Sequence, residues 1–254
     1  MPMRKHLVAL LVIGVSMLFA SSASAVFPNF SDCPRTAPGA IDCLDIQSVT
    51  GSLEIKGFTV PLGESLEIRG AITEPTEAEP ASRFIPPTGT NGFFSRNIRI
   101  PGGLLGIEFW VPGNEVNARA ELAGSTSAVR ILFGLPVTTV SLPVKVKLDN
   151  PILGSNCYIG TNSNPTRVNL TTGTTSPPLP NRPISGSIGT IGFEEGTLTL
   201  RGATSVDNAF AVPGASGCGL LGIASPLVNL RLRLPSAAGN NAMIVTNNIA
   251  IRPV

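Results

Sequence analysis

The residue type that most often transfers protons at neutral pH, histidine, occurs once in this chain. His6 lies within residues 1–25, which have the features of a secretory signal peptide. Arg4 and Lys5 give a charged start, residues 7–20 form an apolar stretch, and residues 23–25 (Ala-Ser-Ala) fit a cleavage site. We therefore expect an exported protein, residues 26–254, that contains no imidazole. Without imidazole, Ser-His-Asp catalysis, Cys-His catalysis and histidine-ligated metal sites are excluded.

The remaining candidates for catalysis are serines and carboxylates. No G-x-S-x-G elbow is present, and Ser216 lies in G-A-S-G-C, where cysteine replaces the last glycine. Glu194 and Glu195 are adjacent, so on a strand they would face opposite sides, and Gly196 favours a hairpin turn there. Glu108 alternates with Ile107 and Phe109, which favours exposure to solvent. We predict no catalytic residue.

Two acidic sets contain the oxygen ligands that calcium prefers. They are Glu74, Glu77 and Glu79, and Asp32, Asp42 and Asp45. Neither set has the spacing of a known calcium loop, so we predict no metal site and no cofactor.

Trp110 is the only tryptophan, and it precedes a Pro112-Gly113 turn. An exposed Trp110 could stack on a ligand, which makes it a candidate ligand contact. General burial trends instead favour a buried anchor.

Four cysteines remain after the expected cleavage: Cys33, Cys43, Cys157 and Cys218. An even number in an exported protein favours two disulfides, for which three pairings exist. We favour Cys33–Cys43 and Cys157–Cys218, because the first pair is local and the cysteines lie near turn-forming residues. A redox or zinc role is disfavoured, since no C-x-x-C motif and no histidine are available.

Charge gives little indication of a partner. Loss of Arg4 and Lys5 would leave 16 basic residues against 16 acidic ones. Nucleic acids and anionic membranes both select concentrated basic surfaces, so we expect neither as a partner. The partner itself is not identified by the sequence.

The elements that would position these residues are mostly strands with period-two alternation. Residues 52–57 (SLEIKG) recur as residues 65–70 (SLEIRG), and residues 196–202 (GTLTLRG) repeat the pattern. We interpret the first two as adjacent strands of one sheet. Further strands are expected at 104–123 (two strands around a turn at 112–114), 129–148, 167–170 and 242–251, with an acidic loop at 73–82.

A helix is predicted from Ser225, a good N-cap, followed by Pro226 at the first helical position. Residues 230–234 (LRLRL) also alternate like a strand, so both alternatives stay open. The fold class expected is all-β: one domain, an antiparallel β-sandwich or flattened barrel, with a short C-terminal helix and two disulfides.

Four stretches of the C-terminal half are distinctive: residues 149–160 (DNPILGSNCYIG), 170–178 (LTTGTTSPP), 206–218 (VDNAFAVPGASGC) and 234–239 (LPSAAG). In these stretches the chain resembles a family of secreted actinobacterial proteins without an assigned activity. The resemblance implies secretion and a β-rich fold and implies no active-site residue.

We therefore expect a secreted, non-catalytic structural or interaction protein of the extracellular space or cell envelope. No lipid-attachment cysteine or membrane anchor is expected. One alternative is a carrier that holds an apolar ligand in a β-barrel, which an enclosed apolar cavity of about 300 Å³ or more would support. Another is a glycoside hydrolase, which needs two carboxylates about 5–10 Å apart in a cleft.

Overall fold

A computed structural model describes residues 27–254. The expected signal peptide with His6 lies outside the described residues. The described chain is mostly strand, with one short α-helix and two disulfides, as predicted. The strands are β1 (Ala40–Ile55), β2 (Phe58–Pro61), β3 (Leu66–Thr73), β4 (Ser82–Ile85), β5 (Phe93–Ser95), β6 (Ile98–Arg99), β7 (Asn117–Leu122), β8 (Arg130–Leu132), β9 (Thr139–Asp149), β10 (Tyr158–Ile159), β11 (Thr166–Thr171), β12 (Thr190–Glu194), β13 (Thr197–Asp207), β14 (Ala215–Ser216) and β15 (Asn241–Pro253). The helix α1 spans Ser225–Arg231, and 3₁₀ turns cover Thr126–Ala128 and Leu220–Gly222.

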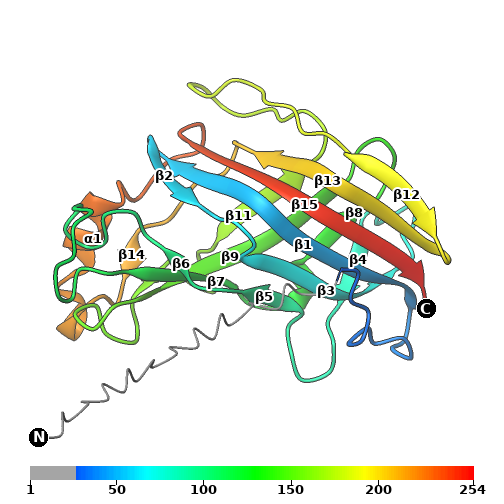
Figure 1. The fold of residues 1–254 in the computed structure, drawn as a ribbon, viewed down its shortest axis with the longest axis horizontal. Coiled ribbons are helices and arrows are strands. Elements are labelled where there is room, and N and C mark those ends of the chain that lie inside the picture. Colours follow the sequence, from blue (N-terminus) through cyan, green and yellow to red (C-terminus); the bar gives the residue numbers. More distant parts are fainter. Residues whose placement is uncertain (1–26) are drawn as a thin grey trace, which may run out of the picture.

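Hydrogen-bonded strand pairs join into a ring. The order β11-β13-β15-β1-β3-β4-β8-β9 is closed by the pairing of β9 with β11, and all these pairs are antiparallel. Figure 1 shows β1, β15 and β13 side by side along one wall, with β9 and β11 passing behind them. The architecture is thus the barrel form of the predicted all-β fold, since closure removes the free edges that a sandwich retains.

Period-two alternation along the strands determines which side chains face the interior of this barrel. Along β15, Met243, Val245, Asn247 and Ile249 are buried, while Ile244 between them is exposed. The same alternation in the other long strands directs Leu, Ile and Val side chains to the lumen. The core is therefore the barrel interior itself.

Several expected elements are confirmed by their positions. The repeat segments lie in β1 and β3, which are neighbours in the sheet, and 242–251 lies in β15. The segments themselves do not pair, because β3 pairs with residues 40–47 of β1 while residues 52–55 pair with β2. Glu195 and Gly196 form the turn between β12 and β13 with positive φ angles of 48° and 73°. The acidic segment connects β3 to β4 without regular structure.

Two local predictions are wrong. Residues 104–114 form a loop rather than a strand, because buried Asn114 accepts a hydrogen bond from Leu105 N and donates to the Gly102 and Ile107 carbonyls. The helix begins at the predicted place, but its N-cap is Ala224. The Ser225 hydroxyl instead accepts a hydrogen bond from Cys218 N at 3.2 Å, so it stabilises the loop before the helix rather than the helix N-terminus. Residues 230–234 form no strand.

Candidate functional site

The main internal feature is a cavity of about 150 Å³ inside the barrel. Its walls include six strands of the ring, β1, β3, β9, β11, β13 and β15, and β7, which pairs with β9; β4 and β8 contribute no residue. Characteristic lining residues are Ile46, Leu53, Ala118, Val140, Leu142, Val168, Met243 and Val245. Surface hollows can be larger, as beside Cys33 (about 550 Å³), but polar and apolar groups share their walls.

Two of the few polar residues along the cavity have side-chain partners within the protein. Asn247 donates to the Ser205 hydroxyl at 3.0 Å, and the Thr138 hydroxyl donates to the Gly134 carbonyl at 3.2 Å. A ligand in the lumen would therefore meet hydrocarbon on nearly every side. Such a cavity favours a neutral apolar molecule, because a polar one would lose its hydrogen bonds to water.

Glu67 is the one carboxylate residue along the described cavity wall. Its neighbours on β3, Leu66 and Ile68, also line the cavity, so alternation turns the Glu67 side chain outward. There its carboxylate lies 2.8 Å from the Arg69 guanidinium. The described lining thus lacks the carboxylate pair that a glycoside hydrolase would place across its substrate.

The other predicted site residues are scattered. Glu108 is exposed, as predicted, and Glu79 pairs with Arg83 on the surface. Asp32 pairs with Arg69 at 2.8 Å, while Asp45 is fully buried nearby. Within residues 27–254, no three acidic, cysteine or histidine side chains gather in a way that could hold a metal ion.

Asp45 is the buried acid whose pKa is shifted most from its ordinary value. Its Oδ2 accepts from Asn29 N at 2.7 Å and from Gln47 Nε2 at 3.0 Å, while Oδ1 has no hydrogen-bond partner among the described residues. Burial raises the pKa of Asp45 to about 7, although these hydrogen bonds act in the opposite direction. The Asp45 carboxyl is covered by the N-terminal segment that the Cys33–Cys43 disulfide attaches to β1.

Asp207 has a structural role. Its carboxylate accepts from Asn169 N at 2.6 Å and from Ala209 N at 2.9 Å, which joins β11 to the end of β13. Burial raises the pKa of Asp207, and the two hydrogen bonds oppose that shift. It does not line the cavity.

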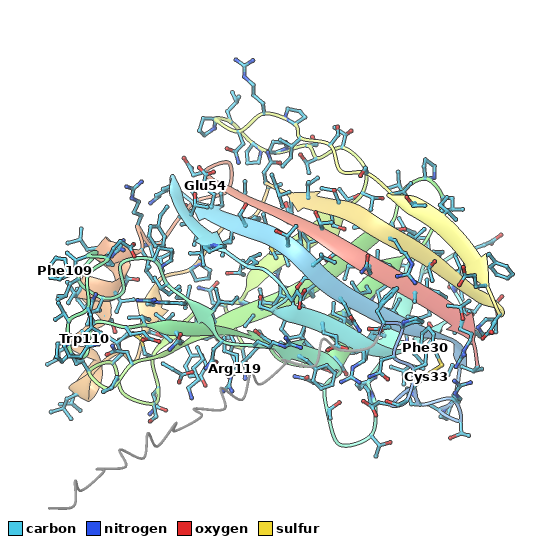
Figure 2. All side chains as sticks on the ribbon, viewed as in Figure 1. Phe30, Cys33, Glu54, Phe109, Trp110 and Arg119 are labelled. Carbon is cyan, nitrogen blue, oxygen red and sulfur yellow. A yellow bond between two sulfur atoms is a disulfide. The ribbon has the colours of Figure 1, made fainter. Side chains whose placement is uncertain are left out.

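Trp110 is 84% exposed, so the expectation of a buried anchor is wrong. Figure 2 shows it beside Phe109 at the end of the molecule that carries α1. The expectation of burial rested on general trends for tryptophan, and the loop of residues 104–114 presents Trp110 to solvent instead. Trp110 lies outside the barrel and does not line the cavity.

The disulfides Cys33–Cys43 and Cys157–Cys218 are both formed, and the described residues include no free cysteine. Two such bonds indicate an oxidising compartment. The described part of the chain has no helix with the length and apolar character needed to cross a membrane.

Sequence reasoning did not identify the individual cavity residues. Alternation indicates which side chains face inward, but only the pairing of distant strands brings them around one space. Comparison with protein-family models, with curated proteins and with solved structures finds no match to this chain. What the cavity can hold is therefore judged from its own size and chemistry.

Proposed function

We propose that the protein is an exported, non-catalytic binding protein that holds one small apolar molecule inside its barrel. The supporting observation is the cavity of about 150 Å³ with an almost wholly hydrocarbon lining. The lining has no carboxylate pair, and its inward-facing polar side chains are few: Thr138, Thr166, Ser205 and Asn247. The two disulfides agree with an extracellular or envelope location.

The size of the cavity limits the ligand. The volume is half of the 300 Å³ typical of sites for drug-sized molecules. An engineered apolar cavity of about 150 Å³ stays dry and binds benzene or xenon. The expected ligand is therefore a compact hydrocarbon or aromatic group of about that size, not an extended lipid chain.

Benzene provides a direct test through thermal unfolding. A ligand that binds only the folded protein raises its stability, so benzene at ten times its Kd should raise Tm by about 2–6 °C. Ala118→Leu on β7 should abolish this shift, because Ala118 is buried against the cavity and leucine would fill part of it. Ala242→Leu is the matched control, since Ala242 alternates with cavity-lining Met243 and faces outward.

The proposal fails if benzene does not change Tm of the unsubstituted protein. It also fails if the Ala118→Leu protein folds and shows the full shift, because benzene would then be bound elsewhere.

A further inference from the structure

Nine exposed apolar side chains gather at one end of the barrel. We call them the apolar crown: Leu105, Phe109, Trp110, Ile152, Leu220, Leu221, Ile223, Leu227 and Leu230. They are between 47% and 95% exposed and make up half of the large exposed apolar residues found among residues 27–254. They come from three segments far apart in sequence, so local composition does not explain their gathering.

Specific contacts hold these three segments together. The Arg231 side chain donates to the Pro101 carbonyl at 2.6 Å and to the Gly103 carbonyl at 3.2 Å, which joins α1 to the loop of Trp110. Asn150 Nδ2 donates to the Gly113 carbonyl at 2.8 Å, which joins the Ile152 loop to the same loop.

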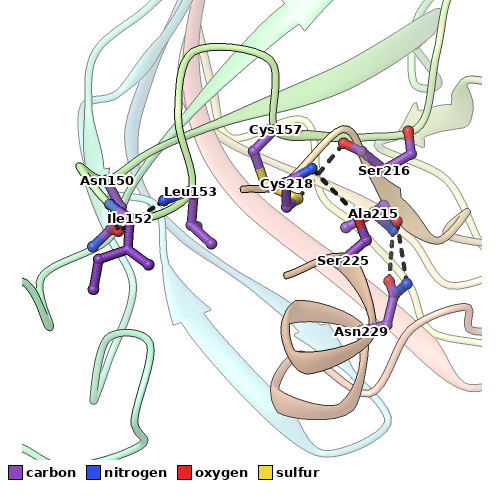
Figure 3. Close-up of a disulfide and its surroundings, with 9 residues drawn as sticks. All are labelled: Asn150, Ile152, Leu153, Cys157, Ala215, Ser216, Cys218, Ser225 and Asn229. Carbon is purple, nitrogen blue, oxygen red and sulfur yellow. Dashed lines mark hydrogen bonds between the residues drawn. A yellow bond between two sulfur atoms is a disulfide. The ribbon is translucent and has the colours of Figure 1, made fainter. Parts of the chain in front are cut away.

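The Cys157–Cys218 disulfide supplies the covalent part of this scaffold (Figure 3). Gly219 N donates to the Leu153 carbonyl at 2.7 Å, and Asn229 both accepts from Ala215 N and donates to the Ala215 carbonyl. The disulfide and these hydrogen bonds thus hold the three segments in place, with the apolar side chains of the crown exposed.

The size of the crown indicates that something covers it. Seven aliphatic and two aromatic side chains with these exposures present roughly 500–1,000 Å² of apolar surface. The largest apolar patch on a typical monomer is about 300–600 Å² and is often functional. A stable protein interface buries about 800 Å² on each partner, so the crown is large enough to be a docking surface.

Charge and hydrogen bonding favour lipid as the occupant over a second protein. Residues 219–230 carry no charge, and Glu108 in the opposite loop offsets only one of the two flanking charges, Arg231 and Arg233. The crown itself is therefore uncharged and offers little to a strongly charged partner. Protein interfaces form about one hydrogen bond per 100–200 Å². Three crown residues have backbone N–H groups that bond within the protein: Leu105 N to Asn114, Ile152 N to Asn150, and Ile223 N to the Leu220 carbonyl.

A backbone group that is bonded within the protein tolerates a hydrocarbon environment, so these three positions can lie against lipid. Leucine, isoleucine, phenylalanine and tryptophan are also the side chains that insert at a lipid surface, with tryptophan at its polar boundary. We propose that the apolar crown docks the protein reversibly onto a lipid surface, through apolar contact rather than charge. This inference does not depend on what the barrel cavity holds.

Trp110 is the only tryptophan in the chain, so its intrinsic fluorescence reports directly on the environment of the crown. With phosphatidylcholine vesicles, the purified protein should float with the vesicles and its fluorescence should shift to shorter wavelength. Raising the salt concentration to 1 M should leave binding unchanged, because no charge attraction is involved.

The double variant Leu220→Ser/Leu221→Ser should weaken binding about tenfold or more, since each exposed leucine contributes apolar area. The control Leu179→Ser/Phe193→Ser removes two exposed apolar side chains outside the crown and should bind normally. Circular dichroism checks that both variants fold.

Three results would overturn the proposal. One is the absence of vesicle binding, and another is binding that needs anionic lipid and disappears in salt. The third is a fluorescence shift without lipid, accompanied by a dimer in sedimentation, because a second copy would then cover the crown.

Discussion

Asp45 shows how one side chain can link this fold to pH. The carboxyl group lies under the N-terminal segment, and residues on the neighbouring strand supply both a cation, Arg69, and an acid, Glu67. Asp45 and Asp32 seemed equivalent in the sequence as acids near the first disulfide. Their difference arises because the segment from Phe27 to Cys33 folds back over β1, which a local pattern does not reveal.

We predict that stability falls as pH rises from about 4 to about 7. Asp45 has a folded pKa of about 7 and an unfolded pKa near 4, so in this window the folded state binds the extra proton. The loss amounts to at most about 4 kcal/mol, after which this residue adds no further pH dependence. Asp45→Asn should remove most of the decline and stabilise the protein at pH 8, because Asp207, whose pKa burial also raises, contributes the rest.

Urea unfolding at pH 4, 6 and 8 measures this effect. Asp32→Asn is the matched control, since Asp32 is exposed and should leave the decline in place. A decline that persists undiminished in Asp45→Asn would assign it to another group.

At the scale of elements, strands were predicted better than loops. The period-two segments of β1, β3, β11 and β15 were recognisable because one face is buried along their whole length. The loop of residues 104–114 was not, since its conformation depends on the buried amide of Asn114 and on Arg231 from a distant helix. Trp110 was expected to be buried from general trends for tryptophan, which do not take account of where this loop lies.

The two disulfides should contribute unequally to stability. Cys157–Cys218 closes a sequence separation of 61 residues and Cys33–Cys43 one of 10. Loop-closure entropy gives about 4 and about 3 kcal/mol respectively, so Cys157→Ser/Cys218→Ser should lower the free energy of unfolding more than Cys33→Ser/Cys43→Ser.

Urea titration of the two double variants side by side makes this comparison. Each serves as the other's control, because both lose one bridge and two sulfur atoms. The reverse order would show that strain or residual unfolded structure outweighs loop length.

At the scale of the whole molecule, the all-β class could be predicted from the sequence, whereas the closure of the sheet into a barrel could not. Alternation specifies an inner and an outer face for each strand, but a sandwich and a barrel use the same alternation. The pairing of β9 with β11 decides between them, and it also creates the cavity. The crown likewise exists only because three loops meet at one end of the closed barrel.

Xenon bound in crystals under pressure tests the central claim most directly. The account predicts one xenon site inside the barrel, in contact with residues such as Ala118, Val140 and Val245, with no ordered water there before xenon is added. A lumen filled with ordered water, or one that excludes xenon while surface sites take it up, would contradict the proposal that the barrel holds a small apolar molecule.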